Sequence, residues 1–136
     1  PISRAFRCCH SKNMPGLGMF QSQGLPTRHL LTCPSGARRI SVTGCNVENA
    51  SYGLTICAER TALVKAVSEG HKNFKAMAIA SNMNDLTMPC GACRQFIIEF
   101  GKDIVIYAAA ADGRVLTKRA DELLPLSFGA SDLPSK

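Results

Sequence analysis

No apolar run in this chain approaches the roughly 18 residues that a membrane-spanning helix needs. The opening stretch also lacks the order of a secretory signal, in which a basic segment precedes an apolar one. Internal repeats and low-complexity tracts are missing as well. These absences argue against a membrane protein and predict a soluble, cytoplasmic one.

Long basic clusters are also absent, although 16 Lys and Arg against 10 Asp and Glu give a net charge of +6. The basic residues are scattered, with only short pairs such as Arg38-Arg39 and Lys118-Arg119. Binding to a phosphate backbone favours a continuous basic patch or stripe. We therefore expect a solvated surface and no polynucleotide partner.

The remaining composition is that of one globular domain with a sizeable core: 136 residues, 46% hydrophobic and 19% charged. Seven cysteines are many for this length. Because their number is odd and no export signal precedes them, a disulfide framework is disfavoured. Reduced thiols are expected, some of them as metal ligands.

The chain changes character near residue 38. Turn-forming Pro, Gly and Ser residues interrupt every apolar run before that point, so no helix or strand is predicted there. Beyond it, strands are predicted over residues 40–47, 76–80 and 104–107, and a short fourth begins at 115–116. One predicted helix has Thr55 or a near neighbour as its cap and ends at Gly70, and a second runs from Pro89 to Gly101. This alternation predicts an α/β fold.

Two short motifs contain the chemically informative residues: Cys57-Ala58-Glu59, and Pro89-Cys90-Gly91-Ala92-Cys93 about thirty residues later. All three cysteines fall at or near predicted helix N-termini, where backbone N–H groups and the helix dipole favour anionic thiolates. Three thiolates leave one open position on a tetrahedral zinc ion, as in catalytic sites. Each motif alone is also compatible with buried thiols or a redox pair, so the prediction depends on their combination.

Glu59 and Arg60 follow the first of these cysteines directly. Glu59 is close enough to Cys57 to accept a proton from a zinc-activated water without binding the metal itself. Three thiolates around a divalent cation carry a net charge of minus one, which weakens the metal as a Lewis acid. We expect Arg60 to hydrogen-bond a ligand sulfur and offset that excess charge.

The combination of Cys-Ala-Glu with a later Pro-Cys-x-x-Cys resembles the signature of the cytidine deaminase superfamily. Polynucleotide-editing members usually carry His at the position of Cys57, so the chain is more similar to the small, tetrameric deaminases of free nucleosides. The resemblance covers roughly residues 39–133, including the string Gly-Cys-Asn-Val-Glu-Asn-Ala-Ser-Tyr over residues 44–52.

This resemblance implies a three-layer α/β/α sandwich with a mixed β-sheet and one Zn²⁺ per chain. It also implies hydrolytic deamination of cytidine and deoxycytidine to uridine and deoxyuridine in pyrimidine salvage. Glu59 would be the proton shuttle, and Cys57, Cys90 and Cys93 the zinc ligands. The implied assembly is a homotetramer whose subunits share their active sites.

The resemblance further assigns the substrate pocket. Asn46 and Glu48 are implied to hold the ribose hydroxyls, and an amide with a carboxylate suits adjacent hydroxyls. The other implied substrate-binding residues are Ala50, Tyr52, Ala58 and Phe128. Among them, Ala50 and Tyr52 would reach a neighbouring subunit's pocket, and Phe128 would cover the base in an adjacent site.

The N-terminal part departs from the family pattern. The family begins with a helix and a Pro-Tyr-Ser-x-Phe segment that opens a core strand, and only Pro1-Ile2-Ser3 and Phe6 are similar to it. The predicted organisation is therefore an atypical segment over residues 1–38 and a deaminase domain over residues 39–136.

Three alternatives to a cytidine deaminase remain open. One is a catalytically inactive zinc-binding relative that has lost its pocket, and another is a deaminase of a modified cytosine nucleoside. The third is a thiol oxidoreductase, which would form a disulfide between Cys90 and Cys93 and bind no metal.

Overall fold

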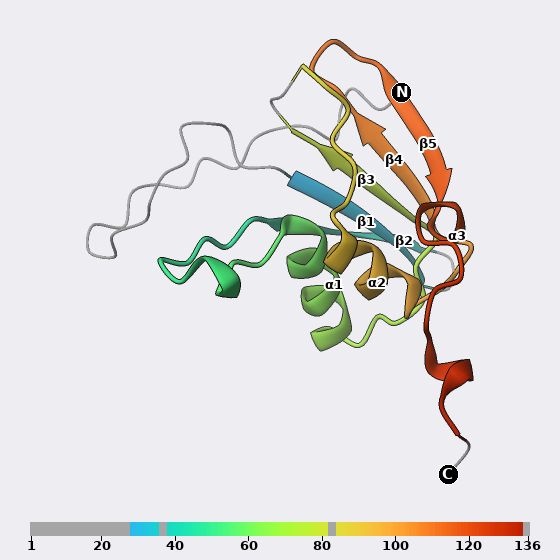
Figure 1. The fold of residues 1–136 in the computed structure, drawn as a ribbon. Helices are drawn as coiled ribbons and strands as arrows, with labels where there is room; N and C mark the ends of the chain where they lie inside the picture. The colour runs from blue at the N-terminus through green and yellow to red at the C-terminus, as the bar shows by residue number, and fades with distance from the viewer. Residues whose placement is uncertain (1–27, 36–37, 82–83, 135–136) are drawn as a thin grey trace.

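A five-stranded mixed sheet is the centre of the fold (Figure 1). The computed structural model describes residues 28–35, 38–81 and 84–134. The strands lie in the order β2-β1-β3-β4-β5; β3 and β4 are parallel, and the other neighbours are antiparallel. Their bounds are β1 Arg28–Ser35, β2 Arg38–Cys45, β3 Ala76–Ala80, β4 Val105–Ala109 and β5 Val115–Arg119. The predicted α/β class with a mixed sheet is confirmed.

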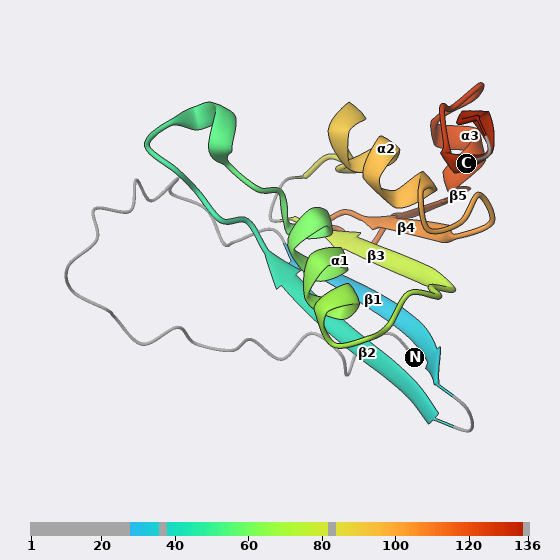
Figure 2. The same ribbon diagram turned by 90° about the horizontal axis from the view of Figure 1, so that it is seen from below.

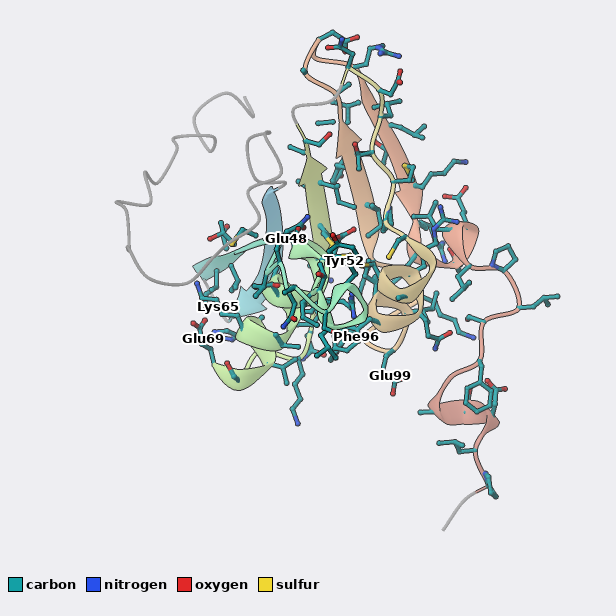
Figure 3. All side chains as sticks on the ribbon, turned by 60° about the vertical axis from the view of Figure 1, so that its left-hand side comes forward. Glu48, Tyr52, Lys65, Glu69, Phe96 and Glu99 are labelled. Atoms are coloured by element: carbon teal, nitrogen blue, oxygen red, sulfur yellow. The ribbon has the colours of Figure 1, made fainter. Side chains whose placement is uncertain are left out.

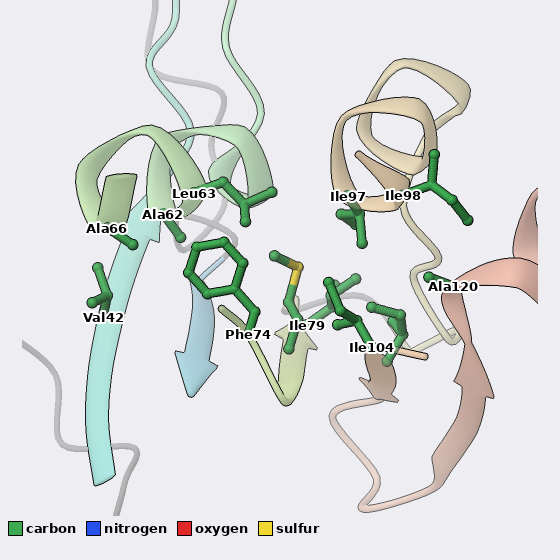
Figure 4. Packing of buried hydrophobic residues seen from close by; sticks show 12 residues of the cluster. Val42, Ala62, Leu63, Ala66, Phe74, Ile79, Ile97, Ile98, Ile104 and Ala120 are labelled. Atoms are coloured by element: carbon green, nitrogen blue, oxygen red, sulfur yellow. The ribbon is translucent and has the colours of Figure 1, made fainter. Parts of the chain in front are cut away.

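Two α-helices, α1 (Ala58–Ser68) and α2 (Gly91–Ile98), pack on one face of this sheet (Figures 2 and 4). The shorter elements are α3 (Ala120–Leu123) and the 3₁₀ turns η2 (Tyr52–Leu54) and η3 (Ala130–Asp132). The described residues thus form two layers, the five-stranded sheet and the layer of α1 and α2. No helix among these residues is long and apolar enough to cross a membrane.

The hydrophobic core fills the space between the two helices and the sheet (Figure 4). Side chains alternate in burial along β3 and β4, as expected when one face of a strand meets a helical layer. The fully buried members include Leu63, Met77, Ile79, Ile97, Ile104 and Ile106. This packing fixes α1 and α2 relative to each other, which matters because both helices begin at a predicted zinc ligand.

Strand β1 is the main difference from the sequence-based expectation, which placed no element before residue 38. Arg28–Ser35 instead lies between β2 and β3, with Leu31 in register with Val42 on one side and Met77 on the other. Both edges of its backbone are therefore paired over Arg28–Thr32, a stabilisation that local sequence does not reveal. Pro34 falls beyond this stretch, where β1 pairs with β2 alone and a missing N–H is tolerated.

The predicted helices are confirmed with small shifts in their bounds. The cap of α1 is Cys57, a near neighbour of Thr55, and the cap of α2 is Cys90. Residues 1–27, including the segment around Phe6, lie outside the described residues. The division of the chain at residue 38 stays a prediction, although β1 shows that part of the N-terminal segment belongs to the central sheet.

Candidate functional site

The three predicted zinc ligands lie together at the N-terminal ends of α1 and α2. Cys57 is the N-cap of α1, Cys90 is the N-cap of α2, and Cys93 lies in the first turn of α2. The Sγ atoms of Cys57 and Cys90 are 3.9 Å apart, those of Cys90 and Cys93 are 3.5 Å apart, and all three lie within 4.8 Å of one another. Residues that are 36 positions apart in sequence thus form one cluster of sulfur atoms.

This spacing fits a tetrahedral zinc ion. With Zn–S bonds of about 2.3 Å, tetrahedral geometry separates ligand sulfurs by about 3.8 Å. The two measured separations, 3.5 and 3.9 Å, lie on either side of that value. Three sulfur ligands leave the fourth position open, and no other His, Cys, Asp or Glu among the described residues joins the cluster.

Glu59 lies beside the cluster and is buried, with only 6% of its surface exposed. Burial raises the pKa of its carboxyl group above the usual value, although hydrogen bonds from its own backbone N–H and from the Cys93 thiol act in the opposite direction. A raised pKa lies closer to neutral pH, and a carboxyl group whose pKa is near the surrounding pH can both accept and release a proton. The structure therefore gives Glu59 the environment of a general acid and base.

The thiols of α2 differ in their tendency to ionise in the metal-free chain. Burial opposes ionisation of Cys90, but its pKa is lowered because hydrogen bonds from the backbone N–H of Cys93 and from neighbouring thiols outweigh that effect. The pKa of Cys93 is raised, first by burial and then by the negative charge of Glu59. Divalent metal binding would compensate for the crowded negative charge that these groups otherwise avoid.

Arg60 contacts the cluster from α1, as predicted. Its Nη2 atom lies 3.7 Å from Cys57 Sγ and donates to the backbone carbonyl of Thr55 at 3.3 Å. The hydrogen bond with Cys57 raises the pKa of the guanidinium group, which therefore stays charged. A permanent positive charge at this position offsets part of the charge of three thiolates.

The loop between β2 and α1 carries the two predicted sugar-binding residues. Val47 and Ile56 close this loop with two backbone hydrogen bonds of 2.9 and 3.0 Å. Asn46 Oδ1 accepts from the backbone N–H of Ala58 at 2.9 Å, and Asn46 Nδ2 donates to Glu48 Oε1 at 3.4 Å. Asn46 and Glu48 are thereby tied to the first turn of α1, the same turn that carries Glu59.

Known proteins share this combination of motifs. A family model described as the cytidine and deoxycytidylate deaminase zinc-binding region matches residues 35–109, which is more than half of the chain. The chain belongs to this deaminase family.

Individual relatives agree with the family match. A probable cytidine deaminase of Dictyostelium discoideum is 53% identical over 95 residues, which cover 69% of this chain and 64% of that protein. A cytidine deaminase of Halalkalibacterium halodurans is 45% identical over 93 residues, which cover 68% and 70% of the two chains. The crystal structure of a cytidine deaminase from Burkholderia pseudomallei matches with a TM-score of 0.70 and 40% identity, over 76% of this chain and 81% of that one.

Three of the four remaining predicted pocket residues of this deaminase family member lie on its surface. Tyr52, which is labelled in Figure 3, is 78% exposed, and Phe128 is 59% exposed. Ala50 is also exposed, whereas Ala58 is fully buried and offers its backbone N–H to Asn46. The chain by itself therefore leaves both aromatic side chains largely in solvent.

Three residues to which the sequence analysis gave no role in the site also shape it. Gly44 lies under the first turns of α1: a Cβ atom there would be 2.5 Å from both the Ala58 carbonyl oxygen and the Ala62 nitrogen. A glycine inside a predicted strand is the signal for such a close backbone approach. The Gln95 amide donates to the Phe128 carbonyl at 2.8 Å, and the Thr55 hydroxyl accepts from the backbone N–H of Asn49 at 3.2 Å; no local sequence signal predicts either contact.

Proposed function

We propose that this chain is a zinc-dependent cytidine deaminase that hydrolyses cytidine and deoxycytidine to the corresponding uridines and ammonia, a reaction of pyrimidine salvage. The observation that carries the proposal is the placement of three cysteine sulfurs within 4.8 Å of one another, two of the separations being close to the tetrahedral zinc value, with the buried Glu59 carboxyl beside them. The names of the curated relatives support the same substrate class.

Cys57, Cys90 and Cys93 would hold one zinc ion per chain. When bound, the metal supplies a Lewis acid that lowers the pKa of a water molecule toward neutrality. Glu59 accepts a proton from the attacking water and delivers it to N3 of the cytosine ring, and it then transfers the second water proton to the departing amine. Water and cytidine thus become uridine and ammonia, and the Glu59 carboxylate is regenerated.

Asn46 and Glu48 would hold the sugar. Because Asn46 Oδ1 already accepts from Ala58, its amide nitrogen is the group left to donate toward a sugar oxygen. The Glu48 carboxylate accepts hydrogen bonds from sugar hydroxyls. A substrate hydroxyl would replace the long 3.4 Å contact between Asn46 Nδ2 and Glu48 Oε1.

The proposed assembly is a cytoplasmic homotetramer with shared active sites. Its support is the exposure of Tyr52 and Phe128, because Tyr and Phe are enriched at protein–protein interfaces relative to the rest of the surface. In the proposed assembly, Ala50 and Tyr52 line a neighbour's pocket, Ala58 borders the base, and Phe128 covers the base in an adjacent site. Analytical ultracentrifugation tests the oligomeric state, and a monomer with full activity would contradict shared sites.

The decisive test is loss of ultraviolet absorbance on adding cytidine, with zinc measured on the same sample. Glu59→Gln is expected to lower kcat by about 10²–10⁴-fold because general acid and base catalysis is lost. Glu69→Gln is the matched control, since Glu69 is exposed at the opposite end of α1 (Figure 3).

The alternatives predict different results. Zinc binding without turnover of cytidine or deoxycytidine would indicate an inactive relative. Turnover of a modified cytosine nucleoside alone would change the substrate class. A protein without zinc in which Cys90 and Cys93 form a disulfide would support the oxidoreductase.

A further inference from the structure

We propose that Thr55 is a positioning residue that orients the Glu48 carboxylate for sugar recognition. This inference rests on the proposed function, because it concerns how the same site selects a nucleoside. It assigns a role in substrate selection to a side chain that lies outside both cysteine motifs.

The Thr55 hydroxyl makes two contacts across the loop. Its Oγ1 atom accepts a hydrogen bond from the backbone N–H of Asn49 at 3.2 Å and donates to Glu48 Oε2 at 3.5 Å. A hydroxyl can do both, since it carries a donor and an acceptor on one atom, whereas the methyl group that replaces it in Val can do neither. The side chain thus joins the two ends of the loop that carries the proposed sugar-binding residues.

Glu48 is thereby held through both of its oxygens. Oε1 accepts a hydrogen bond from Asn46 Nδ2 at 3.4 Å, and Oε2 accepts one from the Thr55 hydroxyl at 3.5 Å. Because Glu48 is exposed, it would otherwise sample many rotamers, and ordering it on substrate binding would cost conformational entropy. The Thr55 contact lowers that cost by ordering the carboxylate before the sugar arrives.

The backbone of Thr55 serves the other half of the site. Its carbonyl accepts from Arg60 Nη2 at 3.3 Å, and the same guanidinium nitrogen lies 3.7 Å from Cys57 Sγ. A side-chain substitution at Thr55 leaves this backbone contact in place. The geometry therefore separates the two roles: removing the hydroxyl alters sugar binding and leaves the sulfur cluster intact.

The test compares Thr55→Val, which keeps the shape and removes the hydroxyl, with Thr55→Ser, which keeps the hydroxyl. Thr117→Val on the exposed surface of β5 is the matched control. Thr55→Val is expected to raise KM for cytidine by about tenfold, with kcat changed by less than about twofold, since uniform binding is lost. Zinc content should equal that of the wild-type protein, and Thr55→Ser should restore KM.

A second substrate makes the test specific. The compound 2′,3′-dideoxycytidine lacks the sugar hydroxyls that would donate hydrogen bonds to Glu48. Its kcat/KM should therefore be nearly the same in Thr55→Val as in the wild type. The preference for cytidine over the dideoxy compound should therefore fall by about tenfold. An active wild-type enzyme with unchanged KM and preference in Thr55→Val would overturn the inference.

A measurement without substrate separates this inference from the proposed function. Loss of the hydroxyl should speed hydrogen exchange of the Asn49 amide, and Thr55→Ser should restore the slower rate. Unchanged exchange in Thr55→Val would overturn the positioning role even if the wild-type protein shows no deamination. Failure of wild-type turnover with the expected change in exchange would count against the proposed function alone.

Discussion

Substituting Gly44 by Ala tests whether the close approach of α1 to β2 sets the geometry of the cysteine cluster. The added Cβ atom would lie 2.5 Å from the Ala58 carbonyl oxygen and from the Ala62 nitrogen, whereas ordinary contacts begin at 3.4 Å. The obstructing atoms are helix backbone, so no side chain can rotate away. Helix α1 must therefore move from the sheet by about 0.9 Å to restore ordinary contact.

The expected cost follows from that displacement. Forcing one extra carbon into a packed core typically costs about 1–3 kcal/mol of folding stability. We expect a cost near the upper end of this range for Gly44→Ala, because helix backbone must move. The same movement would displace Cys57 relative to Cys90, whose sulfurs are now 3.9 Å apart. We therefore expect Gly44→Ala to lose both folding stability and zinc affinity.

Chemical denaturation and zinc analysis on the same preparations measure the two effects. Gly91→Ala is the control, because its Cβ atom would meet nothing within 4 Å although the residue lies between the ligands of α2. This control should be neutral or stabilised by about 0.4–1 kcal/mol, since Ala restricts the unfolded chain. Wild-type stability together with full zinc content in Gly44→Ala would refute the reasoning.

Three further predictions concern the metal and a surface carboxylate. Cys93→Ser should bind less than about half the zinc of the wild type, whereas Cys45→Ser, at the end of β2, should keep it; equal metal content in both variants would contradict the assignment. Chelation of zinc should lower the thermal midpoint in differential scanning calorimetry, because a ligand of the native state stabilises it; an unchanged midpoint would count against a bound metal. The backbone N–H of Arg119 donates to the Glu122 carboxylate at 2.7 Å and holds the pKa of Glu122 below its usual value of 4.5. The ionised Glu122 therefore stabilises the fold fully above pH 4.5, and this stabilisation is lost as the pH falls through the lower pKa of the folded state. An NMR titration midpoint for Glu122 at or above 4.5 would disprove this, and Glu122→Gln should remove the dependence.

Much of the site could be predicted from sequence because its chemistry is local. Cys57, Glu59 and Arg60 lie within one turn of α1, and Cys90 and Cys93 lie within one turn of α2. Helical spacing brings each group together whatever the rest of the fold does. The types of these residues indicated a catalytic metal site, and family resemblance added Asn46 and Glu48 as the predicted sugar-binding pair.

The central sheet was harder to predict where its stabilisation is not local. Arg28–Ser35 has a Pro and few apolar residues, and it becomes a strand because β2 and β3 pair with both of its edges. The contacts of Thr55 were hard to predict for a similar reason. Its hydroxyl suits a helix cap, but the fold brings Glu48 and Asn49 within its reach, and Cys57 takes the capping position.

By itself, then, the sequence determined which chemistry this protein carries: three thiols, one carboxyl group and one guanidinium at spacings that a helix start brings together. Only the tertiary structure decided that the two helix starts meet with sulfur separations of 3.5 and 3.9 Å, and that Glu59 is buried beside them. The physical reason is that both properties depend on contacts between segments distant in sequence. The packing of α1 against Gly44 and of both helices on one sheet supplies those contacts.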